Sequence, residues 1–330
     1  MLLKIKFKAC GMEDYNIWIE KYRPKTFEDI IGQEAIVRKV KAFVETKKLP
    51  HMIFSGFPGT GKSSLALVTA RILYGENWRD NFLELNTSDE RGIDTVRGEV
   101  KNFARTKSVG NFPYRIIFLD ESDALTKEAQ HALRRTMENF SSSTRFIFSC
   151  NFSSKLIEPI QSRCVVFRFK PLSNDAIVKV IKKICEKEDL RINEKVLEII
   201  IKVSDGDVRT ATNILQSAAV LGKNITEESI FEATSYANPK EIMEILHSSV
   251  GGNFLKAREL LLNLMMKQGI DGLEIVKQLQ KEIMGLELKE NKKLEMIEKC
   301  GEVEFRLVEG SDAFIQLQSL IAGFSKIRED

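Results

Sequence analysis

Gly56-Phe57-Pro58-Gly59-Thr60-Gly61-Lys62-Ser63 is the stretch of sequence that decides the fold. It matches the phosphate-binding pattern G-x-x-x-x-G-K-[ST], whose glycines let backbone N–H groups surround phosphate oxygens. In this pattern the lysine reaches the β- and γ-phosphates, and the serine hydroxyl ligates Mg²⁺. The apolar residues 52–54 predict a buried strand before the loop, and 64–73 predict a helix after it. The alternative is a glycine-rich turn with an incidental lysine, and the strand before the loop and the helix after it argue against that alternative. We therefore expect the loop and Ser64 to bind a nucleoside triphosphate at a helix N-terminus.

Composition sets the broad class of protein. The 330 residues are 43% hydrophobic and 29% charged, which is typical of a soluble protein of two or three domains. The net charge is only +3, so any contact with nucleic acid must come from local basic patches. The cysteines are widely spaced without a C-x-x-C pair, and histidines are few, which argues against a zinc site and favours a reducing compartment. No apolar run approaches the roughly 18 residues of a membrane span.

The N-terminus is short, basic and apolar over residues 1–11. Lysines interrupt its apolar part, which is too short for a secretory signal. We expect residues 1–13 to be a disordered extension, with Met12 as an alternative start.

A second nucleotide-binding feature lies at Tyr114-Arg-Ile-Ile-Phe-Leu-Asp120-Glu121. The apolar run predicts a strand buried on both faces, whose carboxyl end brings two acids to the crevice. Asp120 is expected to hold Mg²⁺ together with Ser63, and Glu121 to polarise the attacking water. An acidic strand end without a metal role is the alternative, and the phosphate loop upstream argues against it.

Further strands at 81–86, 144–151 and 165–169 alternate with helices at 34–47, 93–106 and 126–140. Strands that alternate with helices predict an α/β domain with a doubly wound parallel sheet. Before them, Pro24 predicts that residues 18–27 form an extended strap.

The chain is predicted to become helical after Pro171. Ser173 is expected to cap a helix that ends near residue 188, and another helix spans 193–204. Pro239 marks a second boundary, followed by an all-helical region. Its helices are expected at 240–249, 254–267, 271–287, 291–308 and 312–328. The apolar segment 260–266 is predicted to be buried, in part against another subunit.

The sequence alone does not decide the role of three groups of basic residues. Arg97, Lys101 and Arg105 share a helix face that is either solvated or follows phosphates. Arg209 lies near a predicted helix N-terminus, where the dipole disfavours a cation, so either a negatively charged partner or simple surface exposure explains it. Arg134 and Arg135 suit an interface, coupling to DNA or helix solvation equally well.

Several boxes occur in the order found in replication factor C small subunits, which the chain resembles from about residue 14 to its end. They are Trp18 with Glu20-Lys21-Tyr22-Arg23-Pro24, the phosphate loop, Asn86-Thr-Ser-Asp-Glu-Arg-Gly92, Leu119-Asp-Glu-Ser-Asp123, Ala132-Leu-Arg-Arg-Thr-Met-Glu138 and Ser162-Arg163-Cys164. The last two are specific to these AAA+ clamp-loader ATPases. The resemblance implies an AAA+ core at 14–171, a helical lid domain at 172–237 and a helical collar at 238–330.

The resemblance also implies roles for individual residues. Asn151 and Arg209 resemble two sensors of the ATP phosphates, and Asn86 a switch that restrains Glu121 until DNA binds. Arg163 resembles an arginine finger that acts in trans on the ATP of a neighbouring subunit. The segments expected to cover the adenine are Tyr22-Arg23-Pro24 and Ile31-Gly32. The residues expected to follow the DNA backbone are Arg91, Arg97, Lys101 and Lys155, which makes binding independent of sequence and sensitive to salt.

The function expected from this resemblance is clamp loading. A pentamer of small subunits with a large subunit would open a PCNA-type sliding clamp and place it on primer–template DNA, with ATP and Mg²⁺ as cofactors. Its compartment would be the cytoplasm of an archaeon or the nucleus of a eukaryote. Two rivals stay open: another AAA+ motor, such as a helicase-like or recombination-linked ATPase, and a scaffold subunit that binds nucleotide without cleaving it. A C-terminal winged helix would favour the first and a damaged site the second, and neither is evident.

Overall fold

The structure is a computed structural model that describes residues 17–327, apart from 89–93, 95, 111 and 235. The side chains of 96 and 97 also lie outside the described part. The chain forms two compact units. The first comprises residues up to 190 together with 200–216, and the second comprises 191–199 together with 217 onward.

A five-stranded parallel sheet forms the centre of the first unit. Its strands are β1 (His51–Gly56), β2 (Phe82–Asn86), β3 (Arg115–Asp120), β4 (Thr144–Cys150) and β5 (Cys164–Phe169). They are ordered β2-β3-β4-β1-β5. The central strands β1, β3 and β4 are almost entirely buried, as their apolar runs predict. The predicted parallel sheet is confirmed.

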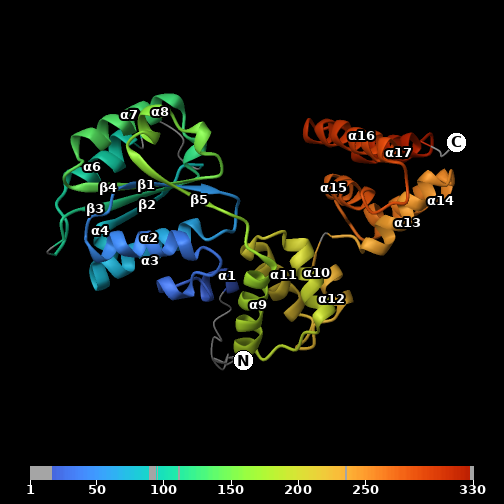
Figure 1. Ribbon diagram of the computed structural model, residues 1–330, viewed down its shortest axis with the longest axis horizontal. Coiled ribbons are helices and arrows are strands. Elements are labelled where there is room, and N and C mark those ends of the chain that lie inside the picture. Colours follow the sequence, from blue (N-terminus) through green and yellow to red (C-terminus); the bar gives the residue numbers. More distant parts are fainter. Residues whose placement is uncertain (1–16, 89–93, 95, 111, 235, 328–330) are drawn as a thin grey trace, which may run out of the picture. The chain divides into compact units, whose positions relative to one another are not determined.

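Helices cover both faces of this sheet (Figure 1). One face carries α2 (Glu34–Glu45), α3 (Lys62–Tyr74) and α4 (Trp78–Asn81), and the other carries α6 (Lys101–Arg105), α7 (Lys127–Asn139) and α8 (Glu158–Gln161). Successive strand residues point to opposite faces. Phe54 therefore packs in the core beneath α2 and α3, whereas Ile53 packs in the core beneath α7. Short 3-10 turns occupy Phe27–Asp29, Gly75–Asn77, Ser122–Ala124 and Ser153–Lys155.

Two local predictions need correction. The strap is not extended throughout, because α1 (Trp18–Lys21) forms one helical turn. Pro24 still limits this helix, since the residue before a proline avoids the α conformation. The predicted helix at 93–106 is regular only at its end: the described part is a π-helical turn, Val96–Val100, followed by α6.

The helices after the sheet begin with α9 (Asn174–Glu188), α10 (Glu194–Ser204) and α11 (Val208–Ala219). The Ser173 hydroxyl accepts the Ala176 N–H at 3.3 Å, which confirms the predicted cap of α9. In the second unit the helices are α12 (Glu227–Ala233), α13 (Pro239–Val250), α14 (Phe254–Leu262), α15 (Gly272–Ile283), α16 (Glu290–Val308) and α17 (Ala313–Phe324). None of the helices in the described residues is long and apolar enough to cross a membrane.

The five last helices enclose a core of their own, to which Leu279 and Phe324 belong. The predicted burial of 260–266 holds only in part. Leu261 and Leu264 are buried, but Met266 is 77% exposed in this chain. Met266 lies in a π-helical turn, Asn263–Lys267, that follows α14, and a helix packed on one side leaves part of its circumference in solvent.

Candidate nucleotide-binding and hydrolysis site

A cavity of about 360 Å³ lies at the carboxyl end of the parallel sheet. The loops that follow β1, β3 and β4 all reach it, because parallel strands end at the same edge. Its size is within the range of small-molecule sites. All of its lining residues belong to the first compact unit.

The phosphate loop is held in shape by its own side chains. Lys62 is buried at the start of α3, and its Nζ donates to the carbonyl oxygens of Gly56 and Phe57, both at 2.7 Å. Burial lowers the pKa of Lys62 from its ordinary value. Residues 58–64 line the cavity. Gly56 and Phe57 do not, and the Phe57 side chain is largely exposed.

Two oxygen groups suited to Mg²⁺ lie side by side in the cavity. The Ser63 hydroxyl donates to Asp120 Oδ2 at 2.7 Å, and Glu121 follows Asp120 on the cavity wall. Among the described residues no group of three or more His, Cys, Asp or Glu side chains is arranged so that it could hold a metal ion by itself. This donor set fits Mg²⁺, which is commonly held by one or two protein oxygens together with substrate phosphates.

The two acids are anchored by Thr87, which lies in the box 86–92 but to which the sequence assigned no role of its own. Its buried hydroxyl donates to the carbonyl oxygens of Asp120 and Glu121, at 3.0 and 2.8 Å. Glu121 itself has a left-handed backbone, with φ of 52°. A non-glycine residue in this region is uncommon and often marks a functional position.

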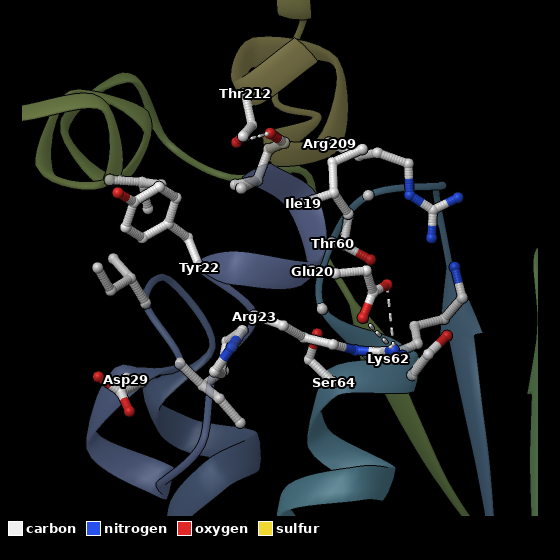
Figure 2. A pocket seen from close by; sticks show the side chains of 18 of the residues that line it. Ile19, Glu20, Tyr22, Arg23, Asp29, Thr60, Lys62, Ser64, Arg209 and Thr212 are labelled. Carbon is white, nitrogen blue, oxygen red and sulfur yellow. Dashed lines mark hydrogen bonds and ion pairs between the residues drawn. The ribbon is translucent and has the colours of Figure 1, made fainter. Parts of the chain in front are cut away.

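The N-terminus of α11 closes over the phosphate loop. The Val208 N–H donates to the Gly59 carbonyl oxygen at 3.3 Å, and Asp207 caps the helix by accepting the Arg209 N–H at 2.7 Å. A Cβ added to Gly59 would lie 1.5 Å from Asp207 Oδ1, so any larger residue would have to displace the carboxylate that caps α11. Arg209 and Lys62 extend toward the same part of the cavity (Figure 2), and Asn151 lines it from the end of β4.

The strap and the 3-10 turn at its end form the other wall of the cavity. The lining residues of this segment are 18–25 and 29–31, so Tyr22, Arg23, Pro24 and Ile31 line the cavity whereas Gly32 does not. Arg23 Nη1 pairs with Glu20 at 3.2 Å (Figure 2).

Residues of α9 complete the cavity, and sequence reasoning missed them. They are Val180, Lys183, Ile184 and Lys187. The apolar stripe of this helix suggested only a core face. Two ion pairs join α9 to the strap and to the 3-10 turn at its end. Lys21 pairs with Glu188 at 2.7 Å, and the Tyr22 hydroxyl donates to the same carboxylate. Lys183 pairs with Asp29 at 2.8 Å.

The two residues expected to act as arginine finger and as switch lie outside the cavity. Arg163 follows α8 and pairs with Glu138. Asn86 ends β2 opposite Asp120, and its Oδ1 accepts the Ser88 N–H at 3.0 Å.

Of the residues expected to contact DNA, Lys101 on α6 and Lys155 in a 3-10 turn are exposed. Arg91 and the side chain of Arg97 lie outside the described residues.

Comparison with known proteins then decides the family. Three family models match: the ATPase family associated with various cellular activities at residues 52–172, the RCF1/5-like AAA+ ATPase lid domain at 179–220, and the replication factor C C-terminal domain at 237–323. The replication factor C small subunit of Archaeoglobus fulgidus is 51% identical over 96% of this chain and 99% of its own length. The chain belongs to the replication factor C small-subunit family. Its relative from Methanococcus maripaludis strain C5 is 50% identical over 92% of this chain and 97% of its own length.

Solved structures show a wider likeness of fold. The Holliday junction branch migration motor RuvB of Thermotoga maritima superposes with a TM-score of 0.55 at 20% identity, covering 69% of this chain and 79% of that chain. A variant of RuvB from the same organism gives a TM-score of 0.57 at 19% identity, covering 90% and 88% of the two chains. At this identity the likeness concerns the fold alone. The expected AAA+ fold, with its lid and C-terminal helical domain, and the expected family are therefore confirmed, and the chain is an AAA+ ATPase of the replication factor C family.

Proposed function

We propose that this chain is the small subunit of a clamp loader that opens a PCNA-type sliding clamp and loads it onto primer–template DNA. Copies of the chain would join a large subunit in a ring-like pentamer. ATP binding would favour the clamp-open state, and hydrolysis would remove that bias and release the closed clamp. The observation that carries the proposal is the cavity that unites the phosphate loop, both acids, Asn151 and Arg209 in a chain about half identical to replication factor C small subunits.

Six polar residues of the cavity have roles in this proposal. Lys62 and Arg209 bind the phosphates of ATP as cations. Ser63 and Asp120 would hold Mg²⁺, which when bound neutralises negative charge on the phosphates. Glu121 orients the attacking water and accepts its proton, and Asn151 hydrogen-bonds the γ-phosphate or that water.

Arg163 completes the site of a neighbouring subunit rather than its own. Its side chain is about one-third exposed and lies outside the cavity of its own chain. A cation supplied in trans stabilises the charge of the phosphoryl-transfer transition state and makes hydrolysis depend on assembly. Asn86, which ends the strand beside Asp120, would restrain Glu121 until DNA is engaged.

DNA would be held through its phosphates. Lys101 and Lys155 supply exposed positive charge on the first unit, and Arg91 and Arg97 belong to the same proposed surface. Contacts of this kind carry no sequence information, and they release counterions, so binding weakens as salt rises. The proposal places the complex in the compartment that holds the replicating DNA.

Steady-state ATP hydrolysis of the assembled complex tests this function. Rates are compared with and without primer–template DNA, at low and high salt, and then with the sliding clamp. We expect primed DNA to stimulate hydrolysis, the stimulation to fade with salt, and the clamp to change the rate further. If neither DNA nor the clamp changes the hydrolysis rate of the fully assembled complex, the result would instead support another AAA+ motor. A complex that binds ATP tightly without turnover would support the scaffold role.

A further inference from the structure

The Arg163 guanidinium is held on two sides by its own chain. Its Nη2 donates to Glu138 Oε1 at 2.6 Å, and its Nη1 donates to the Pro159 carbonyl oxygen at 2.7 Å. Glu138 lies in the last turn of α7, and Pro159 in the first turn of α8. The side chain therefore bridges two helices although it lies at the surface.

Glu138 makes a second contact that fixes its own orientation. The same Oε1 atom accepts Arg134 Nε at 3.0 Å, one helical turn earlier. The hydrogen bond from Arg134 is the main factor that holds the pKa of Glu138 below its usual range, so the carboxylate stays charged at neutral pH. One carboxylate thus lies between two guanidinium groups, and the three side chains carry a net charge of about +1.

The contacts of Arg163 leave part of its donor capacity available. A guanidinium has five N–H groups, and Glu138, Pro159 and the Ser162 hydroxyl, the last at 3.4 Å, take three of them. The remaining donors suffice for a phosphate, which arginine binds well with two parallel hydrogen bonds. The restraint therefore limits the position of the guanidinium without using up its capacity to bind an anion.

We propose that Glu138 is a positioning residue for Arg163, holding the guanidinium where it meets the ATP of the neighbouring subunit. This inference rests on the proposed role of Arg163 in trans. A flexible arginine must give up its rotamer freedom at the transition state, whereas a side chain already restrained by its own chain has less to lose. Glu138 acts only through Arg163 and touches no reacting atom.

The opposite role for Glu138 is to restrain Arg163 away from the neighbour. In that case removal of the carboxylate would release the finger and accelerate hydrolysis. Positioning is favoured because the Pro159 carbonyl supports the same placement from a second element, and because donors of the guanidinium stay unused.

Hydrolysis by the assembled complex tests the inference with Glu138→Ala and Glu138→Gln. We expect Glu138→Ala to lower kcat about fivefold, the factor that an exposed ion pair can supply, with the KM for ATP unchanged. Glu138→Gln keeps a hydrogen-bond acceptor and should lose less. Glu302→Ala is the matched control, because Glu302 pairs with Arg306 at 3.1 Å in the same four-residue spacing on α16. It should leave both kcat and the KM for ATP unchanged.

Adding Glu138→Ala to a chain that already carries Arg163→Lys shows whether Glu138 acts through Arg163. Arg163→Lys retains the charge but cannot donate in both directions as the guanidinium does. In that background Glu138→Ala should change the single-turnover rate less than about twofold. An equal fivefold loss there, an unchanged or raised kcat in the single variant, or a raised KM alone would overturn the positioning role. If Arg163→Ala hydrolyses ATP at the wild-type rate, the trans finger itself fails, which is a different result from failure of Glu138 alone.

Discussion

At the residue scale, the absence of one side chain brings two parts of the site together. Gly59 occupies a position of the phosphate loop at which the pattern G-x-x-x-x-G-K-[ST] accepts any residue. Here its Cα faces the Asp207 carboxylate at the start of α11. Arg209 is in the first turn of that helix, so the close approach at Gly59 also places this cation on the cavity wall, where we propose that it meets the phosphates of ATP. The glycine therefore links the loop to the helix that carries Arg209.

Gly59→Ala is expected to weaken ATP binding at least about tenfold, because the new Cβ pushes away α11 and Arg209, and each tenfold loss is about 1.4 kcal/mol. Gly269→Ala is the matched control. Gly269 belongs to the second unit, has a φ of 69° against 64° at Gly59, and nothing lies within 4 Å of its added Cβ. Both variants should lose comparable stability from backbone strain. Equal ATP affinity in the two, measured by calorimetry on the isolated chain, would contradict the prediction.

At the scale of elements, ion pairs between side chains connect α9 to the strap and to the 3-10 turn Phe27–Asp29. The Lys183 ammonium beside Asp29 is the main factor that lowers the pKa of that carboxyl to about 2. Hydrogen bonds from the residues that begin the 3-10 turn at Phe27–Asp29 act in the same direction. Asp29 and Lys183 both line the cavity, so the ion pair also shapes the nucleotide site.

The ion pair predicts a dependence of stability on pH. The pKa of Asp29 is lowered in the folded state, so its contribution is fully present above the unfolded-state pKa of about 4 and is lost as the pH falls toward 2. The pair is partly exposed, so its contribution should not exceed about 1 kcal/mol. Urea unfolding at several pH values between about 2 and 5 should show a smaller pH slope for Asp29→Asn than for wild type. Lys183→Ala should reduce the slope in the same way. A slope unchanged in both variants would refute the assignment.

At the scale of the whole molecule, nucleotide chemistry and the C-terminal helices belong to different compact units. Every residue that lines the cavity lies in the first unit, whereas α13 to α17 share a separate apolar core. In the proposed loader this division lets the C-terminal helices serve assembly while the first unit binds and hydrolyses ATP.

Leu279→Ala removes a fully buried side chain from the core of the second unit and should cost that unit about 2–5 kcal/mol. In thermal unfolding of the full chain, ATP should raise only the transition of the first unit, because it binds there. The variant should lower the other transition and leave the ATP-sensitive one in place. Leu294→Ala, at a 56% exposed leucine, is the control and should change little. A single transition that moves as a whole would show that the two units unfold together.

The sequence by itself determined the sheet, the order of the phosphate loop and the two acids, and the helical character of the last third. These features depend on local information: apolar runs of strand length, a loop pattern that fixes backbone conformation, and helical periodicity. Its errors were also local, at the helical turn Trp18–Lys21 and at the π-helical turn Val96–Val100.

Only the tertiary structure decided which distant residues meet. Thr87 beneath the two acids, the wall that α9 contributes, the approach of Asp207 to Gly59 and the bond from Arg163 to Glu138 join positions far apart in the chain. No periodicity or spacing records such pairings, because they arise when separately patterned elements pack. The sequence therefore predicts the chemistry of the phosphate site, and the packing of α7, α8, α9 and α11 determines how that chemistry is positioned.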